Sequence, residues 1–321
     1  FQHDASVEYL DLSPSDKTIV TLDAASTMYI WDAYTGELIK EIQLNLARPL
    51  GDENSDCVFL VSDSEVIYPT EESIVCYDFI NDKVVWTVEN IKTQVAACSK
   101  DDSFLAVSDY TKLIVINSEN GEKIYEVEGA DPENINSVFG RNPAFSLDNN
   151  LLALRVTGGY QLGTENSELV DTTEEEVYSM AERTTEEEPD EIDKIIVINL
   201  KTGDLVSEFT YDEEFALDVR FVDNESVAVS AVTFDDESSV VISSALICFN
   251  TSINEIKWIY KNDKESLENI KQGYDEQNII CVQTTNSVIA LSTVDGEVKA
   301  EVDFGEEVSN YQMTNDNSAC I

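Results

Sequence analysis

The chain has 321 residues, of which 65 are Asp or Glu and 19 are Lys or Arg, so its formal net charge at pH 7 is -46. A field of this sign repels phosphate backbones and anionic lipid headgroups, and no basic stretch offsets it. No stretch approaches the roughly 20 consecutive apolar residues that a membrane-spanning helix needs. We therefore expect neither nucleic acid nor direct membrane insertion of this segment, and expect a protein or peptide partner, with cationic ones among the candidates. The simplest interpretation of the charge itself is a solvated acidic surface that keeps the protein in solution.

A short pattern recurs six times along the chain. An apolar triplet that predicts a buried strand is followed by Asp, Asn or Ser, and four residues later by Gly or another residue that tolerates a positive φ. A second apolar segment follows each copy, so each copy predicts two antiparallel strands joined by a tight turn. The anchor and turn residues are, in chain order, Asp32 and Gly36, Asp78 and Asp82, Asn117 and Gly121, Asn199 and Gly203, Asn250 and Asn254, and Ser292 and Gly296.

A further strand-turn-strand unit precedes most copies, as at residues 9–22 and 97–107, so each repeat predicts four antiparallel strands. The anchors are spaced by 46, 39, 82, 51 and 42 residues. Apart from the 82, these spacings match the roughly 40 to 50 residues of a propeller blade. The sequence thus predicts an all-β fold, a β-propeller built from four-stranded antiparallel blades.

We expect residues 1–321 to form a single domain with about six complete blades and part of a seventh. A propeller hides its sheet edges by joining its last blade to its first, so seven or eight blades are expected in the intact ring, within a larger protein. The alternative is that the half-blade closes the ring imperfectly. The predicted blades cover residues 6–45, 57–90, 93–130, 136–210, 216–262 and 268–305, and the partial blade covers 308–321.

The long 82-residue interval contains only one upstream strand-turn-strand unit, so it predicts one blade with an acidic insertion at residues 158–191. Twice within it, two threonines precede three glutamates, a composition that resists burial. It is either a partner-binding loop or a tolerated acidic surface loop. The candidate partner residues are Glu174, Glu175, Glu176, Tyr178, Glu186, Glu187 and Glu188.

The repeats resemble two related propeller families. Trp31-Asp32 at the end of a third strand, after the segment 12–16, resembles a WD40 blade. A Trp eight residues after the anchor resembles the quinoprotein, or PQQ-like, repeat, and Lys40, Ser207 and Ala300 depart from it. The resemblance implies that the aromatic residues pack blades against one another; these are Trp31, Trp86, Tyr125 and Trp258.

Quinoprotein dehydrogenases carry adjacent cysteines beside their cofactor, and no two cysteines adjoin here, so we expect no cofactor. The cysteines are Cys57, Cys76, Cys98, Cys248, Cys281 and Cys320. Most lie in apolar strand-like runs, which predicts buried free thiols. This pattern favours the cytoplasm, with the extracytoplasmic part of a membrane-anchored protein as a close alternative.

The only histidine, His3, lies near the first residue of the sequence, so a histidine-based triad or metal site within the blades is not expected. We interpret the acidic run 235–237 as the tip of a hairpin, and a weak cation site is the less favoured alternative. We assign no catalytic, cofactor or metal residues. The expected function is a non-catalytic platform for protein interaction or ligand sensing. The alternatives are a quinoprotein-like or carbohydrate-active propeller enzyme, and a structural spacer of a surface protein.

Overall fold

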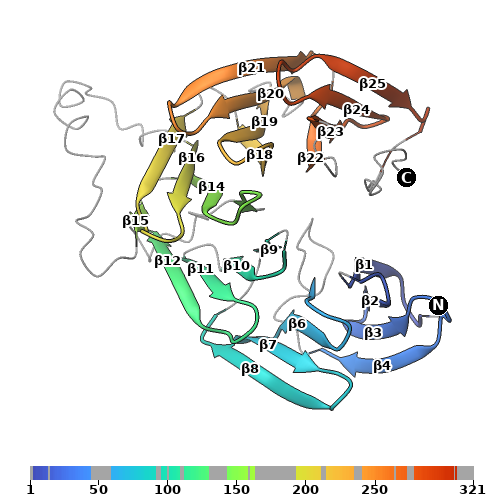
Figure 1. Ribbon diagram of the computed structural model, residues 1–321. Coiled ribbons are helices and arrows are strands. Elements are labelled where there is room, and N and C mark those ends of the chain that lie inside the picture. The colour runs from blue at the N-terminus through green and yellow to red at the C-terminus, as the bar shows by residue number, and fades with distance from the viewer. Residues whose placement is uncertain are drawn as a thin grey trace, which may run out of the picture. The chain divides into compact units, whose positions relative to one another are not determined.

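The computed structural model describes residues 3–13, 15–44, 59–91, 95–99, 101–108, 112–129, 143–157, 160–162, 193–210, 215–234, 241–263, 265–272, 278–306 and 308. The chain divides into two compact units, residues 1–128 and 129–321. Their elements are β-strands arranged in antiparallel sheets (Figure 1). Within these ranges no helix has the length and apolar character needed to cross a bilayer.

The first unit contains three sheets whose strands are adjacent in chain order. The first sheet holds β1 (Val7–Leu12), β2 (Thr18–Asp23), β3 (Thr27–Asp32) and β4 (Leu38–Gln43). The second holds β5 (Phe59–Leu60), β6 (Glu65–Pro69), β7 (Ser73–Asp78) and β8 (Lys83–Glu89). The third holds β9 (Val95–Cys98), β10 (Phe104–Ser108), β11 (Lys112–Asn117) and β12 (Lys123–Gly129).

The second unit repeats this order three times. The fourth sheet holds β13 (Ala144–Phe145), β14 (Leu151–Thr157), β16 (Asp193–Asn199) and β17 (Leu205–Thr210). The fifth holds β18 (Phe215–Phe221), β19 (Ser226–Phe234), β20 (Val241–Asn250) and β21 (Glu255–Asn262). The sixth holds β22 (Glu268–Gln272), β23 (Ile279–Gln283), β24 (Ser287–Ser292) and β25 (Val298–Asp303).

The fourth sheet is interrupted between its second and third strands. β14 pairs with β16 from Leu151 opposite Asn199 to Thr157 opposite Asp193. The chain between these strands therefore leaves the sheet and returns to the same end of it, and short β15 (Tyr160–Leu162) lies within this excursion. The rest of the predicted insertion lies outside the described residues.

The core forms where consecutive sheets pack face to face. In the first unit, Val20 and Ile30 of the first sheet pack with Val66 of the second. The opposite face of the second sheet, including Trp86, packs with Leu105 of the third. Central strands are therefore apolar on both faces, as the continuous triplets require. The second unit packs its fourth, fifth and sixth sheets in the same way. The predicted all-β fold of four-stranded antiparallel blades is confirmed.

Candidate interaction surface

Each anchor residue starts a turn between the third and fourth strands of its sheet. Asp32 Oδ1 accepts hydrogen bonds from the backbone N–H groups of Tyr34 (3.0 Å) and Thr35 (2.7 Å), and the Thr35 bond is the main cause that lowers the pKa of Asp32. The side chains of Asp78, Asn117, Asn199, Asn250 and Ser292 accept equivalent bonds.

The turn closes on a residue with positive φ, which favours Gly, Asn or Asp because a Cβ is strained there. The φ angles are 71° at Gly36, 55° at Asp82, 72° at Gly121, 76° at Gly203, 52° at Asn254 and 72° at Gly296. All twelve anchor and turn residues therefore lie where their sequence pattern places them, at the end of a third strand and before a fourth.

A bulge follows every one of these turns. The register between the third and fourth strands shifts at the same place in each sheet, for example between Cys76 and Tyr77, because the fourth strand carries one extra residue. A bulge redirects the side chains next to it. The residue that follows the extra one is here called the coupling residue; the coupling residues are Lys40, Trp86, Tyr125, Ser207, Trp258 and Ala300.

Two coupling residues are tryptophans that cover a glycine of the next sheet. Trp86 donates from Nε1 to the backbone oxygen of Ser118 at 2.9 Å, and a Cβ built on Gly121 would lie 2.8 Å from Trp86 Cδ2. Trp258 makes the same bond to Thr293, also at 2.9 Å, and a Cβ on Gly296 would lie 2.7 Å from its Cε3. The indole therefore occupies space that only glycine leaves open.

Where the turn residue is not glycine, the coupling residue changes with it. Lys40 forms an ion pair with Asp82, with 2.7 Å between Nζ and Oδ1. Hydrogen bonds from Lys40, and then from Tyr77, hold the pKa of Asp82 below its usual value. Ser207 Oγ donates to Asn254 Oδ1 at 2.9 Å. The two tryptophan coupling residues thus meet glycine, whereas these two polar ones meet Asp or Asn.

Trp31 lies elsewhere than Trp86 and Trp258. It belongs to the third strand, and its Nε1 donates to Thr21 Oγ1 of the same sheet at 2.9 Å. Because side chains alternate along a strand, Trp31 points away from the second sheet that its neighbour Ile30 contacts. His3 bonds the same Thr21 hydroxyl at 2.7 Å and meets the rings of Tyr29 and Trp31 edge-on. Tyr125 is buried.

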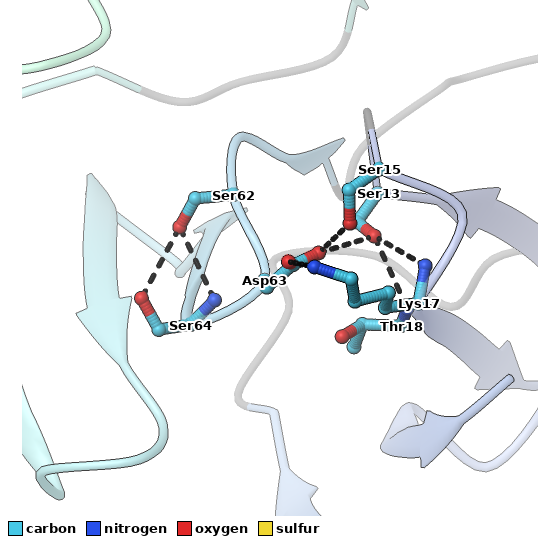
Figure 2. A network of polar contacts seen from close by, with 7 residues as sticks. All are labelled: Ser13, Ser15, Lys17, Thr18, Ser62, Asp63 and Ser64. Carbon is cyan, nitrogen blue, oxygen red and sulfur yellow. Dashed lines mark hydrogen bonds and ion pairs between the residues drawn. The ribbon is translucent and has the colours of Figure 1, made fainter.

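A polar network that the sequence analysis missed joins the first two sheets (Figure 2). The carboxylate of Asp63 accepts hydrogen bonds from Ser13 (2.9 Å) and Ser15 and forms an ion pair with Lys17 at 3.2 Å. The hydroxyl bonds, that from Ser15 first, lower the pKa of Asp63. The equivalent serines of the third and fourth sheets donate instead to an Asp two residues later, Asp101 and Asp148. In the first sheet the corresponding residue is Ser15 rather than Asp. The missing local Asp is the sequence signal that could have indicated a carboxylate from another sheet at this turn.

Apolar side chains project from four of the six anchor turns. The exposed fractions are 77 % for Tyr34, 59 % for Ile80, 64 % for Ile253 and 61 % for Val294, and these are here called the tip residues. Exposed aliphatic side chains also begin the fourth strands that follow, at Leu38, Val84, Ile256 and Val298. Tyr34, Ile80 and Val294 lie two residues after their anchors and Ile253 lies three after its anchor. Two residues after the anchor, the third and fourth sheets carry the exposed polar residues Glu119 and Lys201. The tip residues were not identified from the sequence.

The structure describes the other residues discussed in the sequence analysis only in part. The candidate partner residues 174–176, 178 and 186–188 lie outside the described residues. In the part of the chain that the structure describes, no three His, Cys, Asp or Glu side chains gather as metal ligands would. Cys76, Cys248 and Cys281 are buried free thiols and Cys98 is partly exposed. Burial raises the pKa of Cys76 and of Cys248 to about 12.

Stacked four-stranded antiparallel sheets, with an indole of one sheet on the glycine turn of the next within each unit, define the blades of a β-propeller fold. Among solved structures, the chain is similar to BamB from Moraxella catarrhalis, with a TM-score of 0.61 and 13 % sequence identity over 98 % of this chain and 82 % of that chain. At this identity the likeness concerns the fold. No family model and no curated protein sequence matches the chain.

Proposed function

We propose that this β-propeller is a non-catalytic protein-interaction platform and one module of a larger protein. The observation that carries the proposal is the recurrence of exposed apolar tip residues in one turn of the repeat, two residues after the anchor for Tyr34, Ile80 and Val294 and three residues after it for Ile253. Scattered exposed apolar side chains are normal on protein surfaces. Four at the same turn, above exposed aliphatic residues of the adjoining strands, are a pattern that suits contact with a partner.

The turns hold the tip residues in fixed positions. Around Tyr34, the anchor Asp32 binds two consecutive backbone N–H groups and its own carbonyl accepts the N–H of Gly36 at 2.9 Å. A side chain on a rigid backbone loses little conformational entropy when a partner covers it. These tips therefore suit binding better than side chains on a long loop would.

The partner that fits is a protein or peptide with apolar pockets and a basic surround. The chain carries a formal net charge of -46, and Glu37, Glu255 and Glu297 are exposed at the starts of the strands next to the tips. Opposite charges increase the rate of encounter and suppress wrong partners, and salt screens both effects. Binding should therefore weaken as ionic strength rises.

The acidic insertion is a second contact region in this proposal. Its glutamates at 174–176 and 186–188 supply charge that a cationic partner can pair with, and Tyr178 supplies an apolar ring. The insertion connects two neighbouring central strands of the fourth sheet, β14 and β16. It can therefore be removed and replaced by a short hairpin turn without deleting a strand of that sheet.

The experiment compares proteins captured from an extract of the source organism by four immobilised chains. These are the unmodified chain, a tip variant (Tyr34→Ser, Ile80→Ser, Ile253→Ser, Val294→Ser), a matched control (Glu119→Ser, Lys201→Ser) and a chain in which residues 163–192 are replaced by a hairpin turn. We expect captured proteins that the control retains and the tip variant loses. Capture of the same proteins by the control and the tip variant, or of none by the unmodified chain, contradicts the proposal. The last chain tests whether the insertion contributes.

A further inference from the structure

The anchor turn of the third sheet contains the only Asn-Gly step of the chain, Asn120-Gly121. Asparagine is one of the residues that degrade chemically, and it reacts fastest before glycine, because no Cβ hinders the approach of the following backbone nitrogen. The side chain of Asn120 is exposed, so water reaches it. The step is therefore labile whenever its two reacting groups are free to meet.

The folded turn engages both reacting groups in hydrogen bonds. The backbone N–H of Gly121 donates to the carbonyl oxygen of Asn117 at 2.9 Å. Oδ1 of Asn120 accepts the backbone N–H of Glu122, also at 2.9 Å. The first bond holds the proton that an attacking nitrogen must lose, and the second fixes the side-chain amide in an Asx turn. Reaction therefore requires a local opening of the turn.

Trp86 of the second sheet holds this turn closed. Its ring lies on Gly121, where a Cβ would be 2.8 Å from Cδ2, and its Nε1 donates to the backbone oxygen of Ser118 at 2.9 Å. Both contacts fall within the turn that begins at Asn117, so the turn opens only when they break. The lability of the Asn-Gly step thus depends on the packing of the second sheet against the third.

We propose that Asn120 is a deamidation site whose rate is controlled by the docking of Trp86 on the third sheet. When the turn opens, the backbone nitrogen of Gly121 attacks Cγ of Asn120 and forms a C–N bond. The side-chain nitrogen leaves as ammonia with the proton that the Gly121 nitrogen loses. Water then opens the resulting succinimide at either of its carbonyl groups, which gives aspartate or isoaspartate at residue 120.

An isoaspartate at residue 120 is incompatible with the closed turn. Its backbone runs through Cβ, which adds one carbon between residues 120 and 121 and removes the spacing needed for the bond from Gly121 to Asn117. The product also carries a new carboxylate beside Glu119 and Glu122, which are both exposed. The reaction therefore converts a transient separation of two sheets into a lasting change of this surface.

The test follows the conversion of amide to acid at residue 120 by peptide mass spectrometry, in the full chain held in mildly alkaline buffer. We expect the unmodified chain to deamidate at least tenfold more slowly in buffer than in urea. Trp86→Ala should raise the rate in buffer at least fivefold. The matched control is Trp258→Ala, which removes the equivalent indole from the turn of the sixth sheet and should leave the rate at Asn120 unchanged.

The urea midpoint of each variant shows whether it is folded in buffer. If Trp86→Ala is not, Trp86→Phe replaces it, because this variant retains a ring but loses the bond to Ser118. We expect its rate to lie between those of the unmodified chain in buffer and in urea. The proposal is overturned by equal rates in buffer and urea, or by a Trp86 variant that deamidates no faster than the Trp258→Ala control.

Discussion

Trp86 and Gly121 are a matched pair, because the indole ring occupies the space in which any Cβ at residue 121 would lie, 2.8 Å from Cδ2. A Gly121→Ala substitution must displace the ring and strain a backbone with φ of 72°. We expect it to lower the free energy of unfolding by about 3 kcal/mol, from overpacking of about 1–3 kcal/mol and a left-handed backbone cost of about 1–2 kcal/mol.

Gly36→Ala is the matched control for this substitution, because residue 36 has nearly the same φ, 71°, and no atom of the described residues lies within 4 Å of a Cβ built there. We expect it to carry the backbone cost alone, about 1–2 kcal/mol. Urea denaturation followed by intrinsic fluorescence measures both variants. Equal losses of stability at positions 36 and 121 would show that the indole does not depend on glycine.

Substitutions at Lys40 and Asp82 test whether this ion pair can be replaced by a tryptophan and glycine pair. Lys40→Trp alone places a ring against Asp82, and Asp82→Gly alone removes the partner of Lys40. The double variant recreates the pair that Trp86 and Gly121 form. We expect each single variant to lower the urea midpoint and the double variant to be more stable than the two single effects predict. Additive effects in this double-mutant cycle would contradict the pairing rule.

Asp63 should make the stability of the first unit depend on pH in the acid range. Its pKa in the folded chain is depressed by hydrogen bonds from Ser15 and Ser13. An Asp with a depressed pKa stabilises the fold above its unfolded pKa, about 3.9, and this contribution is lost as pH falls through the folded pKa. We expect Asp63→Asn to flatten the dependence of the urea midpoint on pH below about 5. An unchanged slope would mean that the network in Figure 2 does not hold the charged form.

Cys76 and Cys248 should resist alkylation. Since the pKa of each is raised from 9.0 to about 12, the thiolate fraction at pH 8 falls from about a tenth to about 10⁻⁴, and only the thiolate reacts. We expect iodoacetamide to modify both residues at least a hundredfold more slowly in the folded chain than in urea, as peptide mass spectrometry measures for each site. Rapid modification at either site in the folded chain would place that thiol on the surface.

The features that were predicted from the sequence, namely the repeated turns and the residues that form them, depend on local backbone geometry. Asp32 and Gly36 lie four residues apart in a turn whose hydrogen bonds and positive φ involve only those residues, so the repeat could be identified without the structure. The spacing of eight residues from Asp78 to Trp86 similarly reflects one turn and one bulge. The six sheets of the described residues correspond to the six turns counted in the sequence, whereas the predicted partial blade at 308–321 lies outside the described residues except for residue 308.

What the sequence did not predict depends on contacts between segments. Asp63 accepts a hydrogen bond from Ser13, which is 50 residues away in the sequence. No short-range sequence pattern connects these two residues. Trp31 belongs to a tryptophan-aspartate pair typical of one repeat family, yet its ring lies on the face of the sheet opposite Ile30. Ile80 and Val294 are apolar like the strands beside them, and only the three-dimensional arrangement shows that they project into solvent.

The central claim, that this propeller binds a protein through its anchor turns, is tested most directly with two purified components. A protein captured in the extract experiment is purified, and its affinity for the unmodified chain, the tip variant and the Glu119→Ser, Lys201→Ser control is measured by calorimetry at two salt concentrations. We predict that the tip variant weakens binding at least tenfold, that the control does not, and that added salt weakens binding. Equal affinity for the tip variant and the unmodified chain would contradict the claim.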